Sequence, residues 1–486
     1  MKPASKFKMY QRLFANKAKI YEEVRKAGDE LGIPDELKGK IGLASALSGR
    51  PGELPMEMIK AIEVANRKSV PLAELFENLR EIVKEVYGDE YDAAPINSCE
   101  AALCLAFDVL AAPPMLGRGE NYRARVVAPY ERHMHHQAAY GRPFPPKYKA
   151  LIANRGVTSG ELGMEGKRLN NLDTVIVPLV GAKYEAHGIK RQIVPMLSRV
   201  DPEASVEKIA QVAEKHATML TAFTSLGFDT PGYGYGIRDE YGTPKLSKLI
   251  GKLAREHNVP YIVDNAFGTP FIGTDLRKIN ADVIMYSMDK AVPCPTGGLI
   301  IGREDVMIPI QQALGMHGQR WGTLSSYGKA AYVTFDPGKD AIVGQITMLK
   351  ILRDHPKRIT ESVDELYKIV KEEFEIHSKF KSDILISKTY NSGAVEINYD
   401  RTWKEEELGI PIFSIEDFYA GSDLIGGALK NIGVVPGVSY DAEMLINPGL
   451  GTTDENGNLI EERMRYAIRA LSKALEIICK YAGVVY

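Results

Sequence analysis

Two short apolar runs between residues 261 and 302 each lead into a residue that could take part in chemistry. Asp264 closes the run YIVD, and Lys290 follows the run VIMYS in the segment SMDK. If both runs are parallel strands joined by a helical crossover, their ends meet at one edge of a sheet, where ligands bind in open α/β folds. We therefore expect the acid and the lysine to face one site, although 26 residues separate them.

A lysine amine made nucleophilic by its surroundings forms Schiff bases with aldehydes. Pyridoxal 5'-phosphate (PLP) is the aldehyde cofactor that needs such a lysine, and a neighbouring carboxylate keeps its pyridine nitrogen protonated so that the ring can take up electrons. Lys290 and Asp264 fit these two roles. Ala266 is small enough to lie flat under a ring, and Ser287 could offer its hydroxyl to the phosphate. The PTGG turn that follows removes bulk where the backbone must turn back.

The segment INSCEAALCLAFDVL (96–110) predicts a helix with Ser98 as its N-cap. Amide groups at a helix N-terminus bind phosphate well, so Ser98 and Cys99 are predicted to hold the cofactor phosphate. An ordinary structural cap is the alternative for Ser98, and the two roles are compatible. Cys99 and Cys294 are expected to pack as small side chains rather than to act as nucleophiles.

Three histidines follow a predicted strand in VVAPYERHMHHQAAYG (126–141). An imidazole stacked on the free face of the pyridine ring is one use for a residue at a strand end, with His136 as the first candidate and His133 as the second. A metal cluster is the alternative, since HxHH resembles ligand spacing, but no HExxH motif follows. We predict no metal ion.

Charge and cysteine content limit the possible partners. The chain has 486 residues, with 61 basic and 63 acidic side chains and a net charge of -2. This balance gives no electrostatic reason to expect nucleic acid or an anionic membrane as the main partner. Four cysteines without a CxxC pair suit a reducing compartment, and no run of 18 apolar residues or signal-like N-terminus indicates membrane insertion or export. We expect a cytoplasmic protein.

The elements that must position these residues alternate along the chain. From about 91 to 335, short β-branched runs alternate with helical patterns, which predicts a mostly parallel sheet covered on both faces. The predicted strands are RARVVAPY, RQIVPML, MLTAFTS, VPYIVDN, ADVIMYS and LIIG, and the predicted helices between them are VEKIAQVAEKH and KLSKLIGKLAREHN. Residues 141–171 are Gly- and Arg-rich and weakly periodic, so we expect an inserted active-site or interface loop.

Three regions follow from this pattern. Residues 1–90 are predicted as a mostly helical segment, residues 91–335 as a three-layer α/β/α large domain, and residues 336–486 as a smaller α+β domain. The small domain begins with a long helical region over 338–380, continues with the strands ILISKTYN, GAVEINY and IGVVPGV, and ends with a helix over about 460–483.

Asp264, Ala266, Ser287 and Lys290 together resemble the pattern of fold-type I PLP enzymes, the aspartate aminotransferase superfamily. Within it, NVPYIVDNAFG and YSMDKAVPCPTGGLIIG are most similar to the O-phosphoseryl-tRNA selenium transferase branch, with a weaker likeness to the tyrosine phenol-lyase and tryptophanase group. The resemblance covers about residues 90–330. It implies the fold-type I architecture, a homodimer or homotetramer with active sites at subunit interfaces, and chemistry at the α or β carbon of an amino acid.

The resemblance also assigns residues. It implies that Lys290 is the Schiff-base lysine and Asp264 the pyridinium partner, with Thr224 or Ser225 near the ring hydroxyl. Arg465 in ERMRYAI matches the arginine that binds the substrate carboxylate. Arg320 in HGQRWGTLS matches a phosphate-binding arginine supplied across the dimer, and it is taken here as a second substrate-binding candidate.

These roles predict a PLP-dependent lyase or β-replacement transferase acting on a free amino acid. Lys290 would remove the α-proton, and a leaving group at the β carbon would then depart. An aminotransferase is the first alternative. Two further alternatives are a tRNA-dependent aminoacyl-modifying transferase, whose binding would fall steeply with salt, and a catalytically idle PLP-binding scaffold.

Overall fold

The computed structural model describes the chain in a series of segments, and the structural statements below refer to them. They are residues 9, 11–43, 53–111, 125–130, 190–195, 202–227, 237–316, 322, 332–375, 380–402, 408–411, 422–436, 439–440 and 443–484. Within these segments, no helix combines the length and the apolar character needed to cross a membrane.

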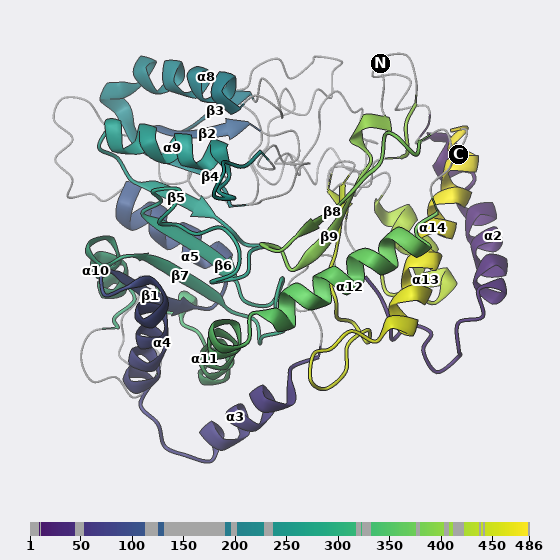
Figure 1. Cartoon of the computed structure of the whole chain (residues 1–486), viewed down its shortest axis with the longest axis horizontal. Helices are drawn as coiled ribbons and strands as arrows, with labels where there is room; N and C mark the ends of the chain where they lie inside the picture. Colours follow the sequence, from purple (N-terminus) through teal and green to yellow (C-terminus); the bar gives the residue numbers. More distant parts are fainter. Residues whose placement is uncertain are drawn as a thin grey trace.

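A seven-stranded sheet forms the centre of the larger domain (Figure 1). Its strands are β1 (Tyr91–Ile96), β2 (Arg125–Tyr130), β3 (Lys190–Pro195), β4 (Leu220–Leu226), β5 (Tyr261–Asp264), β6 (Val283–Ser287) and β7 (Gly298–Arg303). Their order is β1-β7-β6-β5-β4-β2-β3. Neighbouring strands from β6 to β3 are parallel, whereas β7 runs antiparallel to β1 and β6. The predicted mostly parallel sheet is confirmed.

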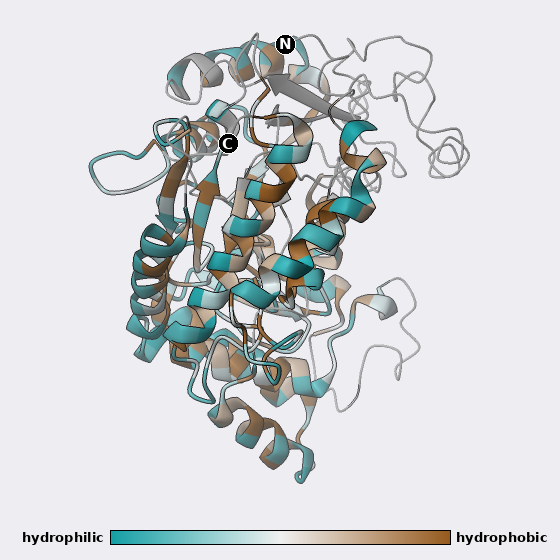
Figure 2. Ribbon diagram, turned by 90° about the vertical axis from the view of Figure 1, so that its right-hand side faces the viewer, coloured by the Kyte–Doolittle hydropathy of each residue, from teal (hydrophilic) through white to brown (hydrophobic). Residues whose placement is uncertain are grey.

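Helices cover both faces of this sheet. On one face, α5 (Cys99–Ala106) and α10 (Glu304–Ala313) pack near β7, and on the other α8 (Pro202–Lys215) and α9 (Lys245–Glu256) pack over β2 to β5 (Figure 1). Helix α9 buries Leu246, Ile250, Leu253 and Ala254, a spacing that places all four on one face of a helix. Figure 2 shows the same separation of apolar and polar residues as stripes along the helices.

The smaller domain has an antiparallel four-stranded sheet in the order β10-β11-β9-β8. Its strands are β8 (Leu385–Thr389), β9 (Ala394–Asn398), β10 (Ser439–Tyr440) and β11 (Glu443–Ile446). The helices of this part are α12 (Lys357–Glu373), α13 (Ser422–Ile432) and α14 (Glu461–Ala482). The remaining helices are α2 (Lys17–Glu30), α3 (Met56–Asn66), α4 (Leu72–Tyr87) and α11 (Lys339–Asp354), with short turns η1 (Phe107–Ala111), η4 (Ala217–Met219), η7 (Val333–Phe335) and η8 (Asp400–Thr402).

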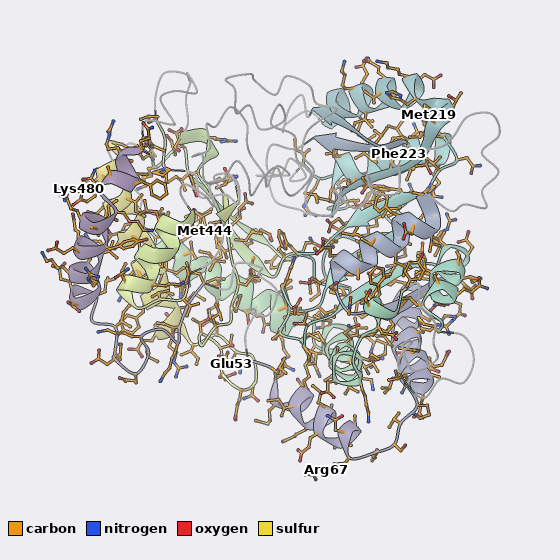
Figure 3. The ribbon with its side chains drawn as sticks, turned by 180° about the vertical axis from the view of Figure 1, so that it is seen from behind. Glu53, Arg67, Met219, Phe223, Met444 and Lys480 are labelled. Atoms are coloured by element: carbon orange, nitrogen blue, oxygen red, sulfur yellow. The ribbon has the colours of Figure 1, made fainter. Side chains whose placement is uncertain are left out.

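Buried apolar side chains form two cores, one in each domain. Phe223 lies in the first and Met444 in the second, and Figure 3 shows them in separate parts of the molecule. The N-terminal helices divide between these cores, because α4 belongs to the first while α2 packs on α13 and α14 in the second. The predicted boundaries at residues 90 and 335 stay predictions.

Several elements differ from the sequence expectations. The connection from β5 to β6 is an irregular segment over 265–282, not a helical crossover, because Gly268, Pro270 and Gly273 disfavour a helix there. The helical region over 338–380 is broken before Pro356 into α11 and α12. Strand β1 was not predicted because Pro95 weakens its strand pattern, but β1 is an edge strand, where proline is tolerated.

Candidate active site

The ends of β5 and β6 bring the two key motifs together. These strands are parallel neighbours, with Asp264 of β5 opposite Met285 of β6. Lys290 follows β6, and its Nζ lies 4.7 Å from the centre of the Phe267 ring, three residues beyond Asp264. The segment DNAF and the segment SMDK therefore meet at the carboxyl end of the sheet, the place expected for a ligand in such a fold.

The Lys290 amine lies in an unusual setting for a lysine. The residue is only partly exposed, and within the described part of the chain its amine forms no ion pair with a carboxylate. The face of the Phe267 ring attracts the ammonium group without using it as a hydrogen-bond donor. The amine therefore stays available to a reacting partner.

The Asp264 carboxylate is fixed by its own turn. Its Oδ1 accepts a hydrogen bond of 3.1 Å from the amide of Ala266. Burial raises the pKa of the neighbouring Cys99 thiol well above its usual range, the Asp264 charge raises it further, and the Lys290 charge lowers it. Cys99 is therefore a protonated, buried thiol close to both charged groups, which agrees with the predicted packing role rather than with a nucleophile.

The N-terminus of α5 lies beside this pair of charges. Ser98 is the N-cap, and its Oγ accepts a hydrogen bond of 3.2 Å from the amide of Ala101. Gly298 at the start of β7 lies so close that a Cβ there would be 2.7 Å from the amide nitrogen of Cys99. Because Gly298 pairs with Ser287 across the sheet, the helix N-terminus lies over the end of β6.

The Ser287 hydroxyl is hydrogen bonded within its own turn. Its Oγ donates a hydrogen bond of 2.7 Å to Oδ1 of Asp289, and both side chains are buried. The predicted role of Ser287 toward a phosphate stays a prediction. The sequence did not predict Asp289 as the partner of Ser287. Its position directly before the lysine was the available signal.

Thr224 and Ser225 point to opposite faces of the sheet, because successive residues of a strand alternate. Ser225 Oγ is hydrogen bonded to the hydroxyl of Tyr261, on the face away from Asp264. Thr224 shares the face of Asp264, since Leu226 pairs with Asp264 and Thr224 lies two residues earlier. Both residues therefore stay predictions, and only Thr224 lies on the face of the sheet that carries Asp264.

Arg465 lies far from this site, which corrects its predicted role. Its guanidinium pairs with Glu372 at 2.6 Å and Glu373 at 2.5 Å, in the last turn of α12. The first turn of α12 is the end near Lys290, because Ile359 and the carbonyl of Ala291 both lie beside Gly393. About 14 residues of helix separate the two ends, which is roughly 20 Å at 1.5 Å per residue, and Figure 1 shows α12 running from the large domain to α14.

The carboxylates around Arg465 account for its placement. Hydrogen bonds from Glu372, Glu461 and Glu373, in that order of importance, raise the pKa of the guanidinium. This is an ordinary helix-to-helix ion-pair cluster. The sequence motif could not distinguish it from a substrate clamp, because both need an arginine near the start of the last helix.

Three predicted site residues, His133, His136 and Arg320, lie outside the described residues, as does the predicted insertion 141–171. Within the described segments, no group of three or more His, Cys, Asp or Glu side chains is arranged to hold a metal ion. The residues that the structure does bring together are Ser98, Cys99, Asp264, Ala266, Phe267 and Lys290.

Part of this chain is similar in sequence to cysteine desulfurases. No protein-family model matches the chain. It is 29% identical over 136 residues to cysteine desulfurase IscS of Stutzerimonas stutzeri (strain A1501), and 31% identical over 140 residues to cysteine desulfurase IscS of Ectopseudomonas mendocina (strain ymp). In both comparisons the match takes in 27% of this chain and 34% of the relative. The chain thus spans about a third of the length of the curated relatives it matches.

Solved structures match over most of the chain, at low identity. Pyridoxamine-pyruvate aminotransferase from Mesorhizobium loti superposes with a TM-score of 0.49 and 13% identity, covering 93% of this chain and 95% of that structure. Alanine–glyoxylate aminotransferase from Nostoc sp. superposes with a TM-score of 0.49 and 11% identity, covering 90% and 95%.

Proposed function

We propose that this chain is a PLP-dependent enzyme of the fold-type I class that acts on a free amino acid. The observation that carries the proposal is the position of the Lys290 amine over Phe267, beside the end of the strand that closes with Asp264. The partial identity with cysteine desulfurases supports it from the sequence side. A near-neutral net charge of -2 favours a small substrate over a transfer RNA.

The residues present fit this cofactor. An amine with no ion pair among the described residues suits an aldehyde, an acid at the next strand end suits a protonated ring nitrogen, and a capped helix N-terminus suits a phosphate. Gly298 allows that helix to approach the sheet more closely than any side chain would permit. When bound, PLP would supply an aldehyde for an amine and a ring that takes up electrons from a substrate carbon.

Each side chain then has a definite task. Lys290 would hold the cofactor through its amine and afterwards move the proton at the substrate Cα. Asp264 would keep a proton on the ring nitrogen, and its bond to the Ala266 amide fixes the direction of the carboxylate. The α5 N-terminus at Ser98 and Cys99 would bind the phosphate, with Thr224 near the ring.

We propose elimination or replacement at the β carbon as the reaction. Loss of the α-proton to Lys290 places an electron pair that can expel a leaving group from Cβ, and water or another nucleophile can take its place in replacement. Cysteine is the first substrate to test, because the relatives that match part of the chain are named cysteine desulfurases. We further propose that the enzyme is a cytoplasmic homodimer, and that His133 or His136 lies over the ring and Arg320 binds an anionic group of the substrate.

The test is to reduce the purified protein with borohydride in the presence of PLP and to map the modified peptide. For the wild-type protein with PLP we expect a visible absorbance band before reduction and a cofactor adduct on Lys290 after it. The Lys290→Ala variant should lose both, whereas Lys252→Ala, at a side chain that is 72% exposed, should keep both. An adduct on another lysine, or a band that persists in Lys290→Ala, would overturn the assignment.

The substrate class is tested on the same protein. Cysteine and other amino acids with a leaving group at Cβ should change the visible spectrum and release that group, together with ammonia and a keto acid in the case of elimination. Amino-group transfer to an added keto acid, with the Cβ substituent retained, would instead identify an aminotransferase. A spectrum that no amino acid changes would indicate a catalytically idle scaffold.

A further inference from the structure

A small-domain side chain reaches into the segment that follows Asp264. Asn391 lies in the turn between β8 and β9, and it faces Asn265, the residue next to Asp264. Asn391 Nδ2 donates to Asn265 Oδ1 at 2.9 Å, and Asn265 Nδ2 donates to Asn391 Oδ1 at 3.1 Å. Both residues are fully buried. The two amides therefore form a reciprocal pair across the junction of the two domains.

The Asn391 amide also binds the backbone on two further sides. Its Nδ2 donates to the carbonyl of Gly227, just beyond β4, at 3.0 Å. Its Oδ1 accepts from the amide of Thr274 at 2.9 Å. One side chain thus joins the end of β4, the residue after β5 and the irregular segment that leads to β6. Because these polar groups are buried away from water, each hydrogen bond supplies a partner that the group would otherwise lack.

The packing leaves the amide pair little freedom. A Cβ at Gly273 would lie 2.7 Å from Asn391 Cγ, so only glycine permits this approach. Thr269 donates its backbone amide to the carbonyl of Asn391 at 2.5 Å, which ties the turn to the same segment through the main chain. The pair is therefore held on both of its sides by backbone, and neither amide can rotate without losing a buried hydrogen bond.

We propose that Asn391 is a positioning residue for Asp264, a statement that rests on the proposed function. Asn265 is fixed by Asn391, and the Asp264 carboxylate is fixed by the amide of Ala266, so the three successive residues are held from both domains. These hydrogen bonds set the direction in which the Asp264 carboxylate meets the cofactor ring. Through Asn391, the small domain therefore acts on Asp264, the partner of the ring nitrogen, and not on Lys290.

The test uses two variants of Asn391 and one matched control. Asn391→Asp keeps the acceptor for Thr274 but removes both donated bonds, and Asn391→Leu removes all of them. The control is Asn447→Leu, because Asn447 Nδ2 donates to the carbonyls of Ser392 and Gly393 at 2.7 and 3.0 Å and so supports the same turn from another side. The control variant has lost turn support, but its amide pair is intact.

Two measurements are made on each protein. Hydrogen exchange of the peptide covering 261–273 is followed without cofactor, and the PLP dissociation constant and visible absorbance maximum are followed with it. For both Asn391 variants we expect faster exchange and a shifted maximum, because buried groups lose their hydrogen-bond partners. We also expect the dissociation constant to rise roughly tenfold, which is about 1.4 kcal/mol. Asn447→Leu should leave the maximum unchanged.

The outcomes separate this inference from the function on which it rests. If the wild-type protein binds PLP through Lys290 but the Asn391 variants keep the wild-type exchange, maximum and affinity, the positioning role is wrong and the function stands. If Asn447→Leu shifts the maximum as much as they do, the turn has only a structural role. If the wild-type protein binds no PLP, both proposals fall together. Should Asn391→Leu not fold, Asn391→Asp decides alone, because it preserves the shape of the side chain.

Discussion

Replacing Gly298 by alanine should weaken the binding of PLP, because the added side chain would displace the N-terminus of α5. An added Cβ would lie 2.7 Å from the amide nitrogen of Cys99 and would also meet the Ser98 carbonyl group. Non-bonded carbon contacts are favourable at about 3.5–4.0 Å, so the start of α5 must move by roughly 1 Å. The groups that would be hit are backbone atoms, and they cannot turn aside as a flexible side chain can.

The expected cost follows from that displacement. Overpacking of this kind destabilises a protein by about 1–3 kcal/mol. The amides that would bind the cofactor phosphate move with the helix, so we expect the PLP dissociation constant to rise roughly tenfold, which is about 1.4 kcal/mol of binding free energy. The assays are denaturant unfolding of the apoprotein and titration of its visible absorbance with PLP.

Gly338→Ala is the matched control, because a Cβ at Gly338 meets no atom within 4 Å. This variant should bind PLP with the wild-type dissociation constant. The reasoning would be refuted if Gly298→Ala bound PLP as tightly as Gly338→Ala, since the N-terminus of α5 would then not be the phosphate site. The same conclusion would follow if Gly298→Ala lowered the stability of the protein but not its affinity for PLP.

Three further predictions follow from the same structure. Arg465→Ala should leave the KM for an amino-acid substrate unchanged, because the guanidinium pairs with Glu373 in the small domain, and a steady-state assay would expose an error if KM rose. Burial raises the pKa of Asp92, but hydrogen bonds led by Arg80 outweigh it and lower the pKa overall. The stabilisation from Asp92 is therefore present above its unfolded-state pKa and lost as the pH falls through the lower folded-state value, so Asp92→Asn should flatten the acid limb of stability measured by denaturant unfolding. The native protein should resist thiol reagents at neutral pH and expose four thiols on unfolding, because all four cysteines are buried, and rapid native labelling would contradict this.

The apolar runs and their end residues were sufficient to predict six of the seven strands of the central sheet, β1 being the exception. Strands β2 to β7 lie where β-branched runs end in turn residues, and a buried parallel strand leaves that signal in any sequence. The meeting of Asp264 and Lys290 at one sheet edge was predicted for the same reason, since the direction of parallel strands fixes which ends lie together.

Other features depended on contacts that the sequence does not encode locally. The face on which Thr224 and Ser225 point depends on strand register, and the real position of Arg465 depends on how α12 and α14 pack. The role of Asn391 could not be predicted at all, because 126 residues separate it from Asn265. Hydrophobic periodicity fixes which elements form and which way their ends point. The partners of a polar side chain are decided only when distant segments are brought together and every buried donor must find an acceptor.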